Sequence, residues 1–251
     1  MWKTGPLFIF FNISMCGITG IFAADKNDFR VTADYSTKYI WRGQNVNNKG
    51  VFEPSVYLSL YGFTAYAWGN LDLTNEHHNR GEFTEIDLIV DYSAAVAGLE
   101  GLNFSAGAIH YQFPNTFSRP TTEIYGGLSL NVPLTPSIKV YCDIDETNGC
   151  YMQFAIGHIF EKIARFSDDC FCGLQLGSSI GWGNSVYNNN YFNTNEGKFN
   201  DLLLSAGFPV CIGRWTVRPA INYSMMLSDA IRSATDKSDN LWGGISVSRS
   251  F

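Results

Sequence analysis

Charged side chains recur at alternating positions in the segment 29–43 of this sequence. They stand four residues apart, at Arg30, Asp34, Lys38 and Arg42. The odd positions from Phe29 to Trp41 are mainly apolar and aromatic. Successive side chains leave a β-strand on opposite sides, so the spacing predicts one charged and one apolar face on a long strand. A face with charges of both signs either braces an interior through ion pairs or borders a path for solutes.

The same alternation places further charged residues on one face of later strands. We predict that these, with the four above, line the lumen of a barrel: Glu85, Asp87 and Asp91 in 83–92, Glu123 in 122–131, and Lys139 with Asp143 in 137–144. Arg42 and Glu123 are of most interest among them. A salt-bridge network that fills a narrow barrel is the alternative to direct contact with a solute.

The sequence contains little that indicates a catalytic or metal-binding site. The histidines are His77, His78, His110 and His158. No P-loop, dinucleotide fingerprint or HExxH motif is present. Barrel phospholipases and proteases pair His with Ser or Asp, and His110 is the candidate for such a base, without a family signature around it. We therefore assign no catalytic residue, metal or cofactor, and keep a barrel enzyme as an alternative function.

The cysteines do not form a closed set of disulfides. Five follow residue 24, at Cys142, Cys150, Cys170, Cys172 and Cys211, and an odd number leaves at least one unpaired. Cys142 and Cys150 lie symmetrically about Glu146, so they would face each other across a hairpin. They are either a disulfide formed in an oxidising compartment or small apolar residues facing lipid.

The elements that would position these residues are strands that follow a secretory signal. Residues 1–24 combine an early Lys3, an apolar run and small residues at Ala23 and Ala24, which predicts a signal peptide. A retained anchor helix is the alternative. No later apolar run is long enough for a membrane helix. If residues 25–251 lie in a membrane, they must therefore form a barrel.

Composition and loop spacing favour that barrel. Charged residues are only 16% and aromatic residues 15% of the 251 residues, and the mean hydropathy is near zero at −0.05, as alternation between lipid and lumen produces. The net charge of −6 argues against nucleic acid as a partner. About twelve strands can be counted, with long loops alternating with short turns. We predict an all-β fold: an antiparallel transmembrane β-barrel with short periplasmic turns and longer extracellular loops. A soluble sandwich is the alternative.

Several short motifs resemble one family. The run from Val31 to Gly43, with Tyr39, Arg42 and Gly43, resembles the opening of the Gcw_chp family, also known as TorF-family porins; Glu85-Ile-Asp-Leu88 and Glu123-Ile-Tyr-Gly-Gly127 follow the same pattern. Trp41 before Arg42, and the cysteines, depart from it. The resemblance implies an outer-membrane β-barrel porin without a defined substrate. The C-terminal residues ending in Phe251 resemble the C-terminal signal by which the barrel-assembly machinery recognises outer-membrane proteins. Arg249 departs from that signal.

We therefore expect a barrel in the cell outer membrane that passes small solutes by diffusion. Its partners would be membrane lipids, the barrel-assembly machinery through Phe251, and the solutes themselves. A structural or adhesive barrel that acts through its outer loops is a third reading, in which Tyr187, Tyr191 and Phe192 would form a contact surface. The sequence leaves the solute and the oligomeric state open.

Overall fold

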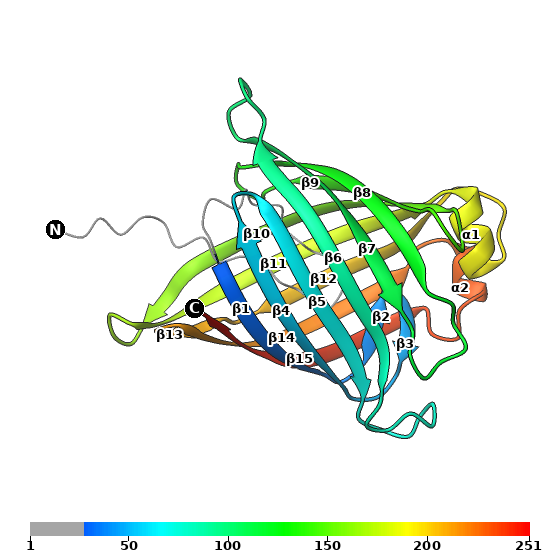
Figure 1. The fold of residues 1–251 in the computed structure, drawn as a ribbon, viewed down its shortest axis with the longest axis horizontal. Coiled ribbons are helices and arrows are strands. Elements are labelled where there is room, and N and C mark those ends of the chain that lie inside the picture. Colours follow the sequence, from blue (N-terminus) through cyan, green and yellow to red (C-terminus); the bar gives the residue numbers. More distant parts are fainter. Residues whose placement is uncertain (1–27) are drawn as a thin grey trace.

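The computed structural model describes residues 28–251, and twelve of its strands cross from one end of the molecule to the other (Figure 1). These are β1 (Asp28–Ser36), β4 (Val51–Leu60), β5 (Phe63–Asp72), β6 (Phe83–Ala95), β7 (Leu102–Gln112), β8 (Thr121–Leu130), β9 (Ser137–Asp143), β10 (Cys150–Arg165), β11 (Cys170–Gly183), β12 (Lys198–Gly207), β14 (Trp215–Met226) and β15 (Asp239–Ser250). The short elements are β2 (Tyr39–Trp41), β3 (Gln44–Asn47), β13 (Val210–Ile212), α1 (Ser185–Phe192) and α2 (Asp229–Ser233).

The sheet closes on itself. Antiparallel pairing runs from β10 through β9, β8, β7, β6, β5 and β4 to β1, and on through β15, β14 and β12 to β11, which pairs with β10. Each crossing strand therefore has two neighbours, so the wall has no free edge. The predicted fold of twelve antiparallel strands is confirmed.

The burial pattern of the wall is the reverse of that in a soluble protein. The inward positions of β1 are Thr32, Asp34 and Ser36, which are buried, whereas Phe29 and Val31 are each 40% exposed on the outside. Other strands repeat the pattern, with buried Ser105 on β7 and Ser129 on β8, and exposed Leu88, Val90, Leu128 and Ile156. A wide apolar outer surface around a polar interior is stable in lipid rather than water. The barrel is a transmembrane one.

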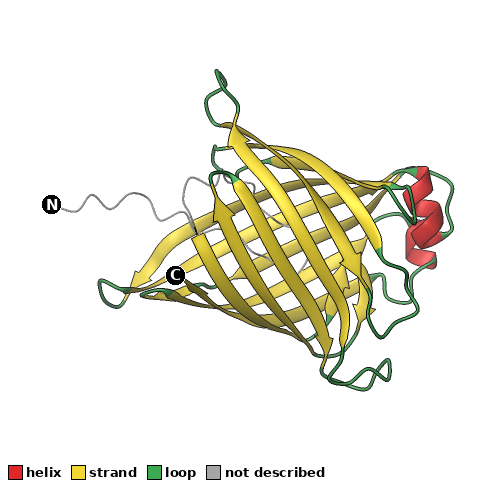
Figure 2. Cartoon of the chain, in the orientation of Figure 1, coloured by secondary structure: helices red, strands yellow, loops and turns green. Residues whose placement is uncertain are grey.

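The two ends of the barrel differ, as the loop spacing predicts (Figure 2). At the end where β1 begins and the C-terminus lies, the strands are joined by the short connections 61–62, 96–101, 131–136 and 166–169 and by 208–214, which contains β13. At the opposite end, called the loop end here, the longest connections are 37–50, 184–197 and 227–238. The last two hold α1 and α2, which lie side by side over that end (Figure 1).

The segment 29–43 is not one strand, as the sequence predicts, and this is the main correction. β1 ends at Ser36, after which the chain bends at 37–38 and forms the hairpin β2–β3. β3 covers the first four residues after the turn at Arg42 and Gly43. Tyr39 and Ile40 are buried at 7% and 2% exposure. Tyr39 and Trp41 therefore belong to the interior and not to the lipid-facing side that the alternation predicts.

Smaller differences concern strand ends and loops. β10 is the longest strand of the described residues and continues to Arg165. Cys142 and Cys150 face each other in the β9–β10 register and form a disulfide. Between residues 28 and 251, no helix is both long and apolar enough to cross a membrane. The expected signal peptide, 1–24, lies outside the described residues.

Candidate constriction inside the barrel

The hairpin β2–β3 turns inside the wall on two residues with positive φ angles. Arg42 has φ 46° and Gly43 has φ 79°, the pairing that a tight two-residue hairpin turn requires. Glycine adopts this conformation without penalty, whereas arginine does not. A Cβ on Gly43 would lie 2.6 Å from the Cβ of Asp201 on β12. The tip is therefore packed tightly against the wall, which accounts for the glycine.

Arg42, at that tip, forms an ion pair across the barrel. Its Nη1 and Nη2 donate to Oε1 and Oε2 of Glu123 at 2.8 and 2.6 Å. Glu123 also accepts from the hydroxyl of Tyr111 at 2.8 Å. From β1 the wall reaches β8 through β4, β5, β6 and β7 in one direction and through β15, β14, β12, β11, β10 and β9 in the other. β8 is therefore nearly opposite β1, and the hairpin bridges the lumen.

Aromatic rings enclose the Arg42 guanidinium. Its Cζ lies 4.5 Å from the ring centroid of Trp41, 4.9 Å from that of Tyr141 and 4.4 Å from that of Tyr151. Ring faces attract a cation most strongly where water is excluded, and the Arg42 side chain is only 8% exposed. The paired carboxylate and these rings together hold the hairpin tip in one position.

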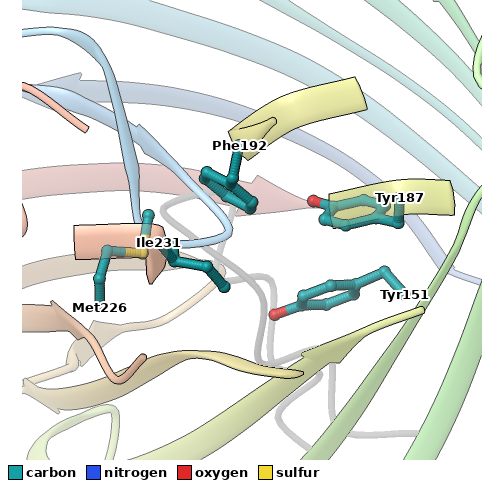
Figure 3. Close-up of a cluster of buried hydrophobic side chains, with 5 residues drawn as sticks. All are labelled: Tyr151, Tyr187, Phe192, Met226 and Ile231. Carbon is teal, nitrogen blue, oxygen red and sulfur yellow. The ribbon is translucent and has the colours of Figure 1, made fainter. Parts of the chain in front are cut away.

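α1 and α2 close the loop end above the hairpin. Tyr187 and Phe192 of α1 are 1% and 3% exposed and pack with Tyr151, Met226 and Ile231 (Figure 3). The ring centroids of Tyr151 and Tyr187 are 5.4 Å apart. These five side chains are called the loop-end cluster here. Tyr187 and Phe192, which the adhesive alternative places in an outer contact surface, are buried instead.

The N-terminus of α1 is tied to the wall by one side chain. Asn184 Oδ1 accepts from the backbone N–H of Tyr187 at 2.8 Å, as an N-cap does. It also accepts from the backbone N–H of Cys150, at the start of β10, at 3.1 Å. Tyr191 lies on the same helix, and its burial raises the pKa of its hydroxyl to about 12. The helix is therefore fixed to the strand that carries the disulfide.

Three buried carboxyl side chains lie on the wall strands β1, β4 and β6, beside the part of the hairpin that contains Tyr39. Asp34 on β1 is in register with Glu53 on β4, and Asn70 on β5 is in register with Glu85 on β6. The β4–β5 register, which pairs Phe52 with Leu71, sets Glu53 opposite Asn70. Asp34, Glu53, Asn70 and Glu85 are called the acidic row here, and all four are buried. Tyr39 and Trp68 pack against each other beside them.

The structure brings together several of the predicted residues. Arg42 meets Glu123, and Asp34 and Glu85 share the acidic row, with Asp87 two residues further along β6. Asp91 and Lys139 meet at one ring, because the Tyr125 hydroxyl donates to Asp91 at 2.8 Å and Lys139 Nζ lies 4.6 Å from the centroid of that ring.

Other predicted residues lie elsewhere. Arg30 pairs with Asp28 at the terminal end. Asp143 accepts from Thr121 Oγ1 at 2.6 Å and from the backbone N–H of Asp145 at 2.9 Å, and so organises a loop-end turn. Lys38 is not on the wall, since it lies in the bend between β1 and β2, where burial and the nearby Lys237 lower its pKa. Arg42 likewise lies on the hairpin and not on a wall strand.

Sequence reasoning overlooked several residues of this interior. Tyr111, Tyr141 and Tyr151 surround the ion pair, and Asp201 accepts from the Tyr151 hydroxyl at 2.9 Å. Glu53 lies in the acidic row. Each has a signal in the strand alternation. Tyr141 and Tyr151 flank the cysteine pair in register and point to the side opposite the cysteines. The hairpin itself has the signal of an Arg-Gly turn between Trp41 and Gln44.

Catalytic and metal sites are not apparent in this interior. His110 shares hydrogen bonds with Thr122 Oγ1 at 2.9 Å and with the Gln112 side chain at 2.8 Å, so neither ring nitrogen meets a carboxylate. Within the described range, no three His, Cys, Asp or Glu side chains are grouped so as to hold a metal ion. Cys170, Cys172 and Cys211 are the free cysteines of this range.

Comparison with known proteins adds the following. No family model matches this sequence, and no curated protein is similar to it in sequence. Among solved structures, the NanC porin is similar with 12% identity and a TM-score of 0.49, over 88% of this chain and 98% of that one. The β domain of the Bordetella autotransporter BrkA has 15% identity and a TM-score of 0.36, over 90% of this chain and 98% of that one. Pseudomonas aeruginosa OccK1 has 12% identity and a TM-score of 0.30, over 79% and 66%. The account of the fold rests on the strand pairing described above.

Proposed function

We propose that this protein is an outer-membrane channel for the passive diffusion of small solutes, with the hairpin β2–β3 as its constriction. One observation carries the proposal: a closed transmembrane wall surrounds an interior lined with charged and polar side chains from many strands. An interior needed only for stability can be packed with apolar residues. Polar lining is instead what a path for hydrated solutes requires.

The hairpin gives this path its narrow point. Arg42 and Glu123 join opposite walls, so a solute has to pass beside the ion pair rather than through the barrel axis. The loop-end cluster narrows the same end further. We therefore expect a small, size-selective conductance rather than the wide opening of a barrel with an empty lumen.

Location and family belong to the same proposal. The even strand number and the alternation of long loops with short turns support insertion in a bacterial outer membrane, with the loop end outside and the termini in the periplasm. The exposure of Phe251, 56% exposed beside Phe29, supports the proposal that the barrel-assembly machinery binds this residue. Membership of the Gcw_chp family rests on the short motifs alone.

Liposome swelling tests the function. Purified protein, shown to be folded by heat-modifiable migration on a denaturing gel, is inserted into liposomes that are then diluted into isosmotic solutions of neutral solutes. We expect swelling with glycerol-sized solutes and little swelling with disaccharides. Empty liposomes provide the baseline. Folded protein that gives no swelling with any solute would overturn the channel proposal and leave the enzyme and adhesive alternatives.

A further inference from the structure

The acidic row has more carboxyl groups than the cations around it pair. At one end of the row, Arg218 on β14 and Asp34 are both in register with Ser246 of β15, and Arg218 interacts electrostatically with Asp34. Glu53 and Glu85 take part in none of the salt bridges found within residues 28–251. The far side of the row thus holds two buried carboxylates without a cation.

Two buried acceptors in the row also lack a hydrogen-bond donor. They are Oε2 of Glu53 and Oδ1 of Asn70, and each residue is only 1% exposed. The amide nitrogen of Asn70 lies 2.7 Å from Thr84 Oγ1 and donates to Asp72 Oδ1 at 3.3 Å. Because a carboxylate oxygen only accepts, the contact with Asp72 sets the orientation of the amide. Buried polar atoms in proteins nearly always have a partner. A carboxyl oxygen and an amide oxygen that lie side by side without donors form a site suited to a ligand with N–H groups.

Aromatic rings complete the surroundings of the row. Tyr39 and Trp68 lie with their ring centroids 5.6 Å apart, and Tyr66 packs against this pair. The faces of such rings favour a cation over an anion. Acceptors without donors, carboxyl groups outside any salt bridge and neighbouring aromatic rings together suit a ligand that carries N–H donors and a positive charge.

From these observations we infer that the solute class of this channel is small organic cations with a protonated primary amine, which the acidic row binds through Glu53 and Asn70. The inference rests on the proposed function, because the row is reached only through the lumen. The N–H groups of an ammonium supply the donors that both acceptors lack, and its charge offsets Glu53 and Glu85. A quaternary ammonium offers charge without donors and would bind more weakly.

Block of ionic current by 1,4-diaminobutane tests the inference. The protein is inserted in a planar bilayer under a KCl gradient, and both the reversal potential and the current with added diamine are measured. We expect preference for K⁺ over Cl⁻, and block by the diamine but not by 1,4-butanediol. Glu53→Gln should weaken the block about tenfold, the effect of one charge-assisted hydrogen bond. Glu100→Gln, which removes an exposed carboxylate from the turn 96–101, should leave the block unchanged.

The outcomes separate this inference from the proposed function. A conducting protein that is unselective or prefers anions, or that the diamine blocks equally in Glu53→Gln and in the native chain, overturns the inference and leaves the channel intact. A protein that does not conduct overturns the channel. In that case, calorimetric titration of the folded protein with 1,4-diaminobutane tests the acidic row on its own. Binding to the native chain that is weaker in Glu53→Gln supports the amine site. Absence of a binding heat rejects it.

Discussion

Arg42 has the largest individual role in this interior, because it combines a strained backbone, a buried charge and a contact with the opposite wall. A non-glycine residue at positive φ costs about 1–3 kcal/mol, and the bidentate pair with Glu123 and the rings of Trp41, Tyr141 and Tyr151 offset that cost. The net attraction within the pair contributes less to stability than the loss of one partner would cost. Removing one partner strands a buried charge.

Replacing Arg42 with methionine tests this directly. Arg42→Met keeps much of the side-chain volume but leaves Glu123 unpaired, so we expect the free energy of unfolding to fall by about 3–5 kcal/mol. The double variant Arg42→Met with Glu123→Gln should recover most of the loss. Denaturant titration in lipid vesicles provides the measurement. Arg119→Met is the control, since its pair with Glu146 spans 3.7 Å and is exposed, a kind of pair worth about 0–1 kcal/mol. Equal losses in Arg42→Met and Arg119→Met would contradict a structural role for the ion pair.

At the scale of elements, the alternation of side chains predicted most of the wall but not the hairpin. On the wall strands, β1 included, charged and apolar residues took the sides that their spacing indicates, as Glu85 and Leu88 illustrate. From Thr37 to Trp41 the alternation continues without a break, although the chain has left the wall. An aromatic residue suits lipid and a packed interior equally well, and the local pattern does not distinguish them. Glu123 and Tyr151, whose contacts with Arg42 hold the hairpin inside the barrel, are distant from it in sequence.

α1 was missed for a similar reason. Its eight residues, rich in asparagine and tyrosine, have little intrinsic helix propensity. The N-cap at Asn184 and the burial of Tyr187 and Phe192 stabilise it instead. Short helices depend on such tertiary contacts rather than on propensity.

The Asn184 cap provides the test at this scale. Asn184→Ala removes the acceptor for the backbone N–H groups of Tyr187 and Cys150, so we expect local stability of α1 to fall by about 1 kcal/mol. Amide hydrogen exchange in residues 185–192 should accelerate about fivefold to tenfold, which is what that free energy corresponds to. Asn189→Ala, an exposed position in the same helix, is the matched control. If exchange in the two variants is the same, α1 is held by packing alone.

At the scale of the whole molecule, a barrel of this size is partly filled from within. The wall alone would leave room along the axis, and the hairpin, the loop-end cluster and the charged side chains occupy much of it. Because Ser36 pairs directly with Val51, β1 and β4 would remain joined in register without the hairpin between them. The wall and the constriction can therefore be separated by a single replacement, which is the basis of the decisive test.

Single-channel conductance in planar bilayers, compared between the native chain and a variant with residues 39–49 replaced by a short Gly-Ser turn, tests the central claim most directly. We predict a small conductance for the native protein and a several-fold larger one for the variant, since the variant lacks the bridge between Arg42 and Glu123. Both proteins should show heat-modifiable migration, which confirms that the barrel is folded. If the folded variant conducts no better than the native protein, or if neither conducts, the hairpin is not the constriction of a channel and the account is wrong.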